Sequence, residues 1–209
     1  MNEYLLKQPI FTTDYLMDRG FTFKMIQQLI EDEQIVRVKR GLYANPTRFK
    51  NAHEAAFTLF PEACFCTLSA AYVYGYIYHA PKEVMIAASK NESRIKYRTE
   101  WLPLSPMYRD VKYYDLGITE ITFNGKTFRL TDRERTVIDV IRHRKSLNPL
   151  DYQRVIQGYI FDDLKDVDRL ICYAIKLRMI KKVQILFDPW IESFTLRCEQ
   201  LHTKCDKIT

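Results

Sequence analysis

The order of elements over residues 11–46 constrains this chain more than any other feature. Thr12 or Thr13 can cap a short helix, Gly20 predicts a turn after it, and Thr22 can cap a second helix. The apolar stripe expected on the second helix consists of Phe23, Ile26, Leu29 and Ile30. The stretch IVRVKRGLYANP then predicts a strand that ends at a tight bend. Two short helices followed by a basic strand are therefore expected at the start of the fold.

The basic strand is predicted to place its cations on one face. Val36 and Val38 alternate with Arg37 and Lys39, so the valines are expected to face the core. Arg40 follows at the bend, where a glycine allows the backbone to turn sharply. Residues 34–50 contain five Lys or Arg and no Asp or Glu. The local excess of positive charge favours an anionic partner such as DNA.

Helix, turn, helix and hairpin in this order predict a winged helix-turn-helix, an element that binds double-stranded DNA. The second helix would enter the major groove, where Gln27 and Gln28 could pair with adenine. Arg37, Lys39 and Arg40 would lie along phosphates. The alternative is that the glutamines are simply solvated and the cations form a solvated face of a protein-interaction module.

Composition sets broad limits. The 209 residues are 47% hydrophobic with a net charge of +6, which suits a soluble globular protein. The uncharged stretch Ala63–Ala80 contains Thr67, Ser69, His79 and four tyrosines, which favours a buried helix over a membrane span. No secretory signal is recognisable, and the five cysteines match no zinc pattern. We therefore expect a cytoplasmic protein with reduced, buried thiols and no membrane partner.

The second half of the chain predicts a mixture of strands and helices. Residues 82–90 read as a central strand, and 118–131 as two strands joined by Asn124-Gly125 in a type I′ turn. Thr131 and Glu134 are expected to form the capping box of the following helix. A last long helix is expected over 167–182, and the tail from 193 to 209 is poorly patterned. The predicted class is α+β.

Sequence motifs of catalysis are missing. No phosphate-binding loop, nucleophile elbow, zinc-protease motif or dinucleotide fingerprint occurs, and the four histidines are scattered. Asp132, Glu134 and Asp139 stand beside arginines, a pattern that suits ion pairing better than metal binding. We therefore predict no enzymatic activity, no catalytic residues, no metal and no cofactor.

Four segments together give a resemblance to a known family. They are IVRVKRGLYANP, FPEACFCTLSAAYVYGY, RLTDRERTVIDVIR and LICYAIKLRMIKKVQILF, in this order within about residues 11–187. The chain resembles the AbiEi antitoxins of type IV, abortive-infection toxin–antitoxin systems, which act in phage defence. The resemblance implies a winged helix-turn-helix over 1–50, an α+β antitoxin domain over 51–192 and an unassigned tail over 193–209.

The resemblance also implies partners and sites. Family members repress their own operon by binding inverted repeats in the promoter, which requires two copies on the DNA. They also counteract a nucleotidyltransferase-like toxin without a stable complex. Carried over to this chain, the DNA contacts would be Thr22, Lys24, Gln27, Gln28, Arg37, Lys39 and Arg40. Arg135, Asp139 and Arg142 are the candidates for antitoxin activity, with a structural role in holding the hairpin against the helix as the alternative. A stand-alone transcription regulator without a toxin is a further alternative.

Overall fold

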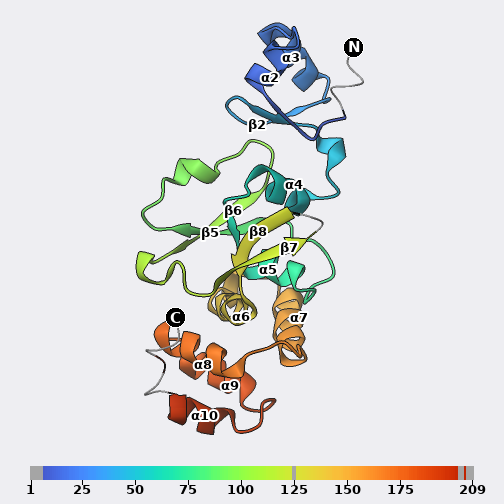
Figure 1. Ribbon diagram of the computed structural model, residues 1–209. Coiled ribbons are helices and arrows are strands. Elements are labelled where there is room, and N and C mark those ends of the chain that lie inside the picture. The colour runs from blue at the N-terminus through green and yellow to red at the C-terminus, as the bar shows by residue number, and fades with distance from the viewer. Residues whose placement is uncertain (1–6, 124–125, 202–204, 206–209) are drawn as a thin grey trace. The chain divides into compact units, whose positions relative to one another are not determined.

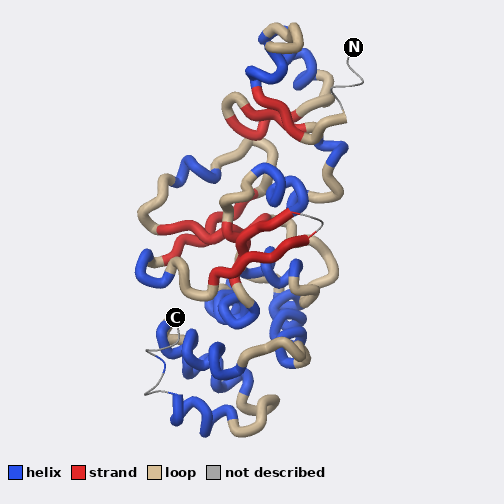
Figure 2. Tube along the Cα trace, viewed as in Figure 1, coloured by secondary structure: helices blue, strands red, loops and turns tan. Residues whose placement is uncertain are grey.

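The structure is a computed structural model that describes residues 7–123, 126–201 and 205 (Figures 1 and 2). It combines helices with two β-sheets, which confirms the α+β class. The chain forms two compact units. The first comprises Met1–Pro61, Lys82–Val84 and Ser93–Ser105, and the second comprises Glu62–Pro81, Met85–Glu92 and Pro106–Thr209.

The first unit contains a three-stranded antiparallel sheet with two helices. Strands β1 (Ile10–Thr12), β3 (Leu42–Ala44) and β2 (Val36–Lys39) pair in that order. Helices α2 (Thr13–Met17) and α3 (Phe23–Glu31) lie between β1 and β2 in the chain. Their small core consists of Phe11, Leu16, Phe21, Ile26, Ile35 and Tyr43. The unit continues with 3-10 helix η1 (Pro46–Arg48), α4 (Ala52–Leu59) and η2 (Arg94–Tyr97).

Both expected N-caps are present in this unit. The Thr12 hydroxyl accepts a hydrogen bond from the Tyr15 amide at 3.1 Å, and the Thr22 hydroxyl accepts one from the Met25 amide at 3.3 Å. Phe23 was expected in the apolar stripe of α3, but 66% of it is exposed. Phe23 lies in the first turn of α3 and lines the same groove as Ile26, but its ring is largely in solvent, so the expectation that it is buried with the stripe is wrong.

The second unit is built on a mixed five-stranded sheet with the order β6-β5-β4-β8-β7. Its strands are β4 (Cys64–Phe65), β5 (Val84–Ser89), β6 (Leu104–Arg109), β7 (Ile118–Phe123) and β8 (Lys126–Thr131). Strands β4 and β8 run parallel, and β7 pairs antiparallel with β8. The predicted strand over 82–90 and the two hairpin strands are confirmed, whereas the Asn124-Gly125 turn lies outside the described residues.

Helices cover one face of this sheet, with α6 (Arg133–Arg142) at the centre. Helix α6 packs against α5 (Thr67–Val73), α7 (Pro149–Ile160), α8 (Val167–Lys176) and α9 (Ile180–Phe187). Figure 1 shows α5, α6 and α7 beside the sheet and α8, α9 and α10 (Phe194–Leu201) beyond them. Short 3-10 helices η3 (Val111–Tyr113) and η4 (Arg144–Ser146) complete the unit.

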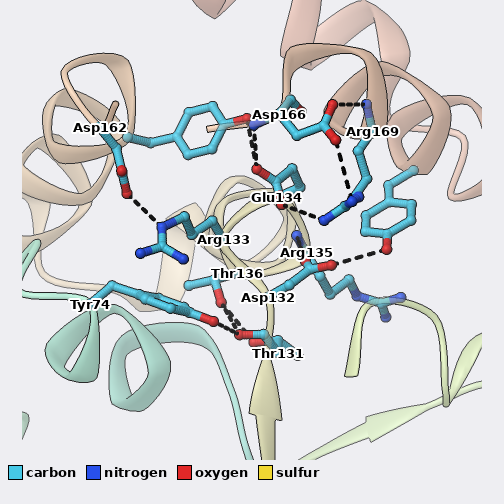
Figure 3. Close-up of polar contacts among 12 residues, drawn as sticks. Tyr74, Thr131, Asp132, Arg133, Glu134, Arg135, Thr136, Asp162, Asp166 and Arg169 are labelled. Carbon is cyan, nitrogen blue, oxygen red and sulfur yellow. Dashed lines mark hydrogen bonds and ion pairs between the residues drawn. The ribbon is translucent and has the colours of Figure 1, made fainter. Parts of the chain in front are cut away.

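The start of α6 differs from the expected capping box. Thr131 is the last residue of β8, and its hydroxyl is engaged with the Thr136 hydroxyl at 2.7 Å. Asp132 is the N-cap instead and accepts a hydrogen bond from the Arg135 amide at 2.8 Å (Figure 3). Glu134 turns away from the helix start and accepts a hydrogen bond from the Asp166 amide at 2.8 Å.

Three further expectations for this half need correction. The single helix over 167–182 is two helices, because Arg178 between α8 and α9 has a φ of +56°. Cys172 and Cys205 form a disulfide, so not all five cysteines are reduced. The 193–209 tail contains α10, whose Phe194 is fully buried. Within the described residues, every helix is too short or too polar to cross a bilayer.

Candidate functional site

Two places in the chain gather the residue types that bind anions: a groove in the first unit and a pocket in the second. The groove measures about 640 Å³ and lies against α3 and the β2–β3 turn. Its lining includes the cations Lys24, Arg37 and Arg40, together with Gln27 and Phe23. No carboxylate belongs to the described residues that line it. The groove is therefore a concave surface whose described lining carries three positive charges and no negative one.

The turn between β2 and β3 explains how the cations are presented. Val38 is completely buried, which anchors β2 to the sheet as expected. Gly41 has a φ of +76°, a conformation that favours glycine and lets β3 return directly after Arg40. Arg37, Lys39 and Arg40 are all exposed, so their charges face solvent. The expected arrangement of valines and cations on opposite faces is confirmed.

The strand does not keep all its cations together. Arg37 pairs with Tyr43 and Lys39 with the adjacent Leu42, so the register shifts between the two cations. The Lys39 ammonium lies 5.6 Å from the centre of the Phe60 ring. Lys39 does not line the groove, whereas Arg37 and Arg40 do. Thr22 and Gln28 also lie outside the lining, although Thr22 caps α3 at the edge of it.

Carboxylates lie close to this surface and limit its positive potential. Gln27 donates to Glu31 at 3.1 Å, and Gln28 donates to Asp32 at 2.9 Å, so both amides have partners on their own helix. Arg37 stands 3.9 Å from exposed Glu100. Exposed pairs of this kind are worth about 0–1 kcal/mol, so a stronger partner can displace them.

In the second unit, α6 carries a buried network of ionic contacts. Arg135 is 2% exposed, donates through Nε to Asp139 at 3.1 Å, and donates through Nη1 to the carbonyls of Tyr113 and Leu116 at 3.2 Å. Because both carbonyls precede β7, Arg135 ties the start of the hairpin to α6. The glycine next to these carbonyls, Gly117, packs so closely on Arg135 that an added Cβ would lie 2.6 Å from the Arg135 Cβ.

A second buried arginine joins the same carboxylate. Arg109, at the end of β6, donates through Nη2 to the other carboxylate oxygen of Asp139. Its Nη1 is buried and has no hydrogen-bond partner among the described residues. Burial disfavours the charged form of both guanidinium groups, and Asp139 opposes this effect. The balance raises the pKa of Arg109 and lowers that of Arg135, where Arg109 and Arg142 add repulsion.

The residues predicted for antitoxin activity meet at a pocket of about 140 Å³. Arg135, Asp139 and Arg142 all line it, as do Arg109 and Lys90. Arg142 is exposed and donates to the Leu177 carbonyl at 3.0 Å. Sequence reasoning missed Arg109, because it lies 30 residues from Asp139 and no local pattern connects them. The three predicted residues are therefore together, in contact with a fourth that the sequence did not identify.

Further ionic contacts surround the start of α6 and hold it in place (Figure 3). Glu134 is 2% exposed, and Arg169 approaches it at 4.0 Å. Arg133 donates to Asp162 at 2.8 Å and stacks on Tyr74. Burial raises the pKa of Glu134, although the Asp166 amide opposes this effect. No group of His, Cys, Asp or Glu side chains suited to a metal ion occurs within the part of the chain that the structure describes.

Comparisons with known proteins add information on the fold. No family model and no curated protein matches the chain. A crystal structure of the RV2827C protein from Mycobacterium tuberculosis is similar, with a TM-score of 0.53 over 95% of this chain and 73% of that one. The two sequences are 12% identical, so the similarity concerns the fold alone.

Proposed function

We propose that this chain is a DNA-binding transcription regulator whose first unit acts as a winged helix. Helix α3 would enter the major groove, and the β2–β3 turn would lie along the backbone. The observation that carries the proposal is the groove between them, where Lys24, Arg37 and Arg40 line one concave surface without a carboxylate in its described lining. Phosphates of DNA supply the complementary charge.

The bases would be read from the exposed face of α3. Gln27 lines the groove and can exchange its exposed bond to Glu31 for a bidentate contact with adenine. Phe23, which is 66% exposed beside it, can contact the methyl group of thymine. This assigns base recognition to Gln27 and Phe23, and backbone contacts to the three cations. Gln28 and Lys39 then have smaller roles than the sequence alone predicts.

The regulator would belong to a type IV toxin–antitoxin system. This part of the proposal rests on the resemblance to AbiEi antitoxins in four ordered sequence segments. It assigns autorepression through promoter inverted repeats, and antagonism of a nucleotidyltransferase-like toxin without a stable complex. The cluster of Arg135, Asp139 and Arg142 is the assigned antitoxin surface. The assignment includes no catalytic step and no cofactor, and it places the protein in the cytoplasm.

A gel-shift titration of the full chain tests DNA binding directly. The probes are the promoter upstream of its own gene and a scrambled duplex of equal length and composition. Tight binding to the promoter alone supports the proposal, whereas equal affinity for both duplexes contradicts it. Co-expression with the neighbouring toxin gene, with growth as the readout, then tests the antitoxin assignment separately. Promoter binding without rescue of growth would indicate a stand-alone regulator.

A protein-interaction module is the second candidate. It is favoured by exposed apolar side chains on α2 and α3, namely Met17 at 41%, Phe23 at 66% and Met25 at 41%. The partners of Gln27 and Gln28 on their own helix also suit a surface that does not read bases. If the full chain retains no DNA at low salt, this second candidate replaces the first.

A further inference from the structure

The pocket beside Arg109 carries an imbalance of charge that the protein itself does not neutralise. Arg109 and Arg135 are 8% and 2% exposed, and both bond to the single carboxylate of Asp139. Two buried guanidinium groups therefore share one negative charge. Burying an uncompensated charge is unfavourable, because the interior solvates ions far less than water does.

Nearby thiols do not supply the missing charge. Cys66 is completely buried, and burial raises its pKa to about 11. Burial likewise raises the pKa of Cys64 to about 12. Both thiols are neutral near pH 7, so the excess positive charge beside Asp139 remains. Any compensation must come from a group that enters the pocket.

Arg109 also offers an unused donor. Its Nη1 is buried without a hydrogen-bond partner among the described residues. Leaving a buried charged donor unpaired is among the more unfavourable states of a polar group. Guanidinium groups bind phosphate and carboxylate oxygens particularly well, because their paired N–H bonds match the spacing of the oxygens.

The remaining charged residues around the pocket favour a dianion. Lys90 and Arg142 are exposed cations at its edge, and the His143 imidazole also lines it. The facing carboxylates are Asp139, which both buried arginines already use, and Asp110, which accepts a hydrogen bond from the Lys112 amide at 3.1 Å. Four Lys or Arg side chains thus surround two carboxylates.

The size of the pocket limits the ligand. Its volume of about 140 Å³ exceeds the space of a few water molecules, each of which takes about 30 Å³ in the liquid. It is smaller than the roughly 300–1,000 Å³ of pockets that enclose drug-sized ligands. A single phosphate group fits a pocket of this volume, whereas a whole nucleotide does not.

We propose that the Arg109–Asp139 pocket binds a phosphate group, either as inorganic phosphate or as the phosphate of a small monoester. The phosphate oxygens accept from the side chains of Arg142 and Lys90, and the buried guanidinium of Arg109 supplies positive charge beside them. The Arg109–Asp139 pair is kept, and the dianion neutralises the charge that Asp139 leaves unbalanced. The site shares no lining residue with the DNA-binding groove. It includes the residues assigned to antitoxin activity, but phosphate binding depends neither on that assignment nor on DNA binding.

Isothermal titration calorimetry of the full chain tests the site, with inorganic phosphate and methyl phosphate as probes at constant ionic strength. Saturable binding of inorganic phosphate with one site per chain is expected. Arg142→Gln and Lys90→Gln change exposed residues and leave the buried pair intact, so both variants are expected to fold and to bind about tenfold more weakly. Lys181→Gln removes an exposed lysine of α9 that does not line the pocket, and it is expected to bind as the wild type does.

The two probes distinguish the sources of the phosphate. Tighter binding of methyl phosphate identifies a monoester as the ligand, and tighter binding of inorganic phosphate identifies the free ion. Proton NMR of the imidazoles then locates the site, because His143 lines the pocket whereas His53 and His79 do not. A shift of the His143 resonance alone supports the proposal. No binding at millimolar phosphate, or equal weakening by Lys181→Gln, overturns it.

Discussion

Arg135 and Asp139 stand one turn apart on α6 and are joined at 3.1 Å, although both side chains are almost completely buried. The pair does more than bridge one helical turn. Arg135 also holds two carbonyls of the segment before β7, and Asp139 also holds Arg109 at the end of β6. One ion pair thus connects α6 to two other elements of the second unit. Its removal is expected to affect the whole unit.

Asp139→Asn tests how much this connection contributes to stability. The substitution keeps the shape of the side chain and leaves two buried guanidinium groups without a carboxylate. We expect the free energy of unfolding, measured by urea denaturation, to fall by about 3–5 kcal/mol. Asp168→Asn is the control, because Asp168 and Arg197 pair at 3.3 Å with about half of each side chain exposed. Asp168→Asn is expected to lower the free energy of unfolding by about 0–1 kcal/mol. An equally small decrease for Asp139→Asn would contradict the prediction.

Gly117→Ala tests the close packing of the hairpin on α6. Gly117 has a φ of +73°, and an added Cβ would lie 2.6 Å from the Arg135 Cβ. Gly75→Ala is a matched control, since Gly75 has a φ of +77° and nothing within 4 Å of the added Cβ. Each substitution should cost about 1–2 kcal/mol for the left-handed backbone. Overpacking should add about 1–3 kcal/mol at Gly117 only, so equal losses in urea denaturation would argue against the packing described.

Stability should also fall in acid because of His53. The side chain is 1% exposed on α4, and burial lowers its pKa from 6.5 to about 4. Between these values the unfolded chain binds a proton that the folded chain does not, so the free energy of unfolding decreases as the pH falls from 6.5 towards 4. The expected slope is about 1.4 kcal/mol per pH unit.

Urea denaturation at pH 6.5 and pH 5 measures this slope. The His53→Leu variant should lose most of the difference between the two pH values. If His53→Leu is as sensitive to acid as the wild type, His53 is not the group responsible.

Gln27→Ala and Gln28→Ala distinguish the groove from the rest of the α3 surface. Gln27 lines the groove, whereas Gln28 does not, and both donate to a carboxylate four residues later. We expect Gln27→Ala to reduce the preference for the promoter over scrambled DNA by about 1–3 kcal/mol. Gln28→Ala should leave the preference nearly unchanged. Competition binding with fluorescent promoter DNA measures both, and a larger effect of Gln28→Ala would place the recognition surface elsewhere on α3.

The sequence predicts local structure well where neighbouring residues determine it. The caps Thr12 and Thr22, the basic β2 strand and the β7–β8 pairing all follow from short patterns. Helix α7 was missed although it had a signal, because Asn148 and Pro149 occupy its cap and first position. The break between α8 and α9 at Arg178 had no signal in the sequence, since a positive φ at an arginine depends on tertiary packing.

Long-range contacts account for most of what the sequence did not predict. Arg109 meets Asp139 across 30 residues, and Cys172 meets Cys205 across 33. Neither pairing has a periodic or compositional signature. The cluster of Arg135, Asp139 and Arg142 could be predicted from the sequence, because helical spacing alone brings these residues close. Its burial and its link to β6 depend on the folded sheet.

The most direct test of the DNA-binding proposal is the salt dependence of promoter binding, measured by fluorescence anisotropy. The wild type is compared with a variant that carries Lys24→Ala, Arg37→Ala and Arg40→Ala, and with Lys50→Ala as an exposed control outside the groove lining. The slope of log K against log salt should decrease by about 0.9 for each groove cation that contacts a phosphate, and Lys50→Ala should not change it. An unchanged slope in the triple variant would contradict DNA binding through this groove.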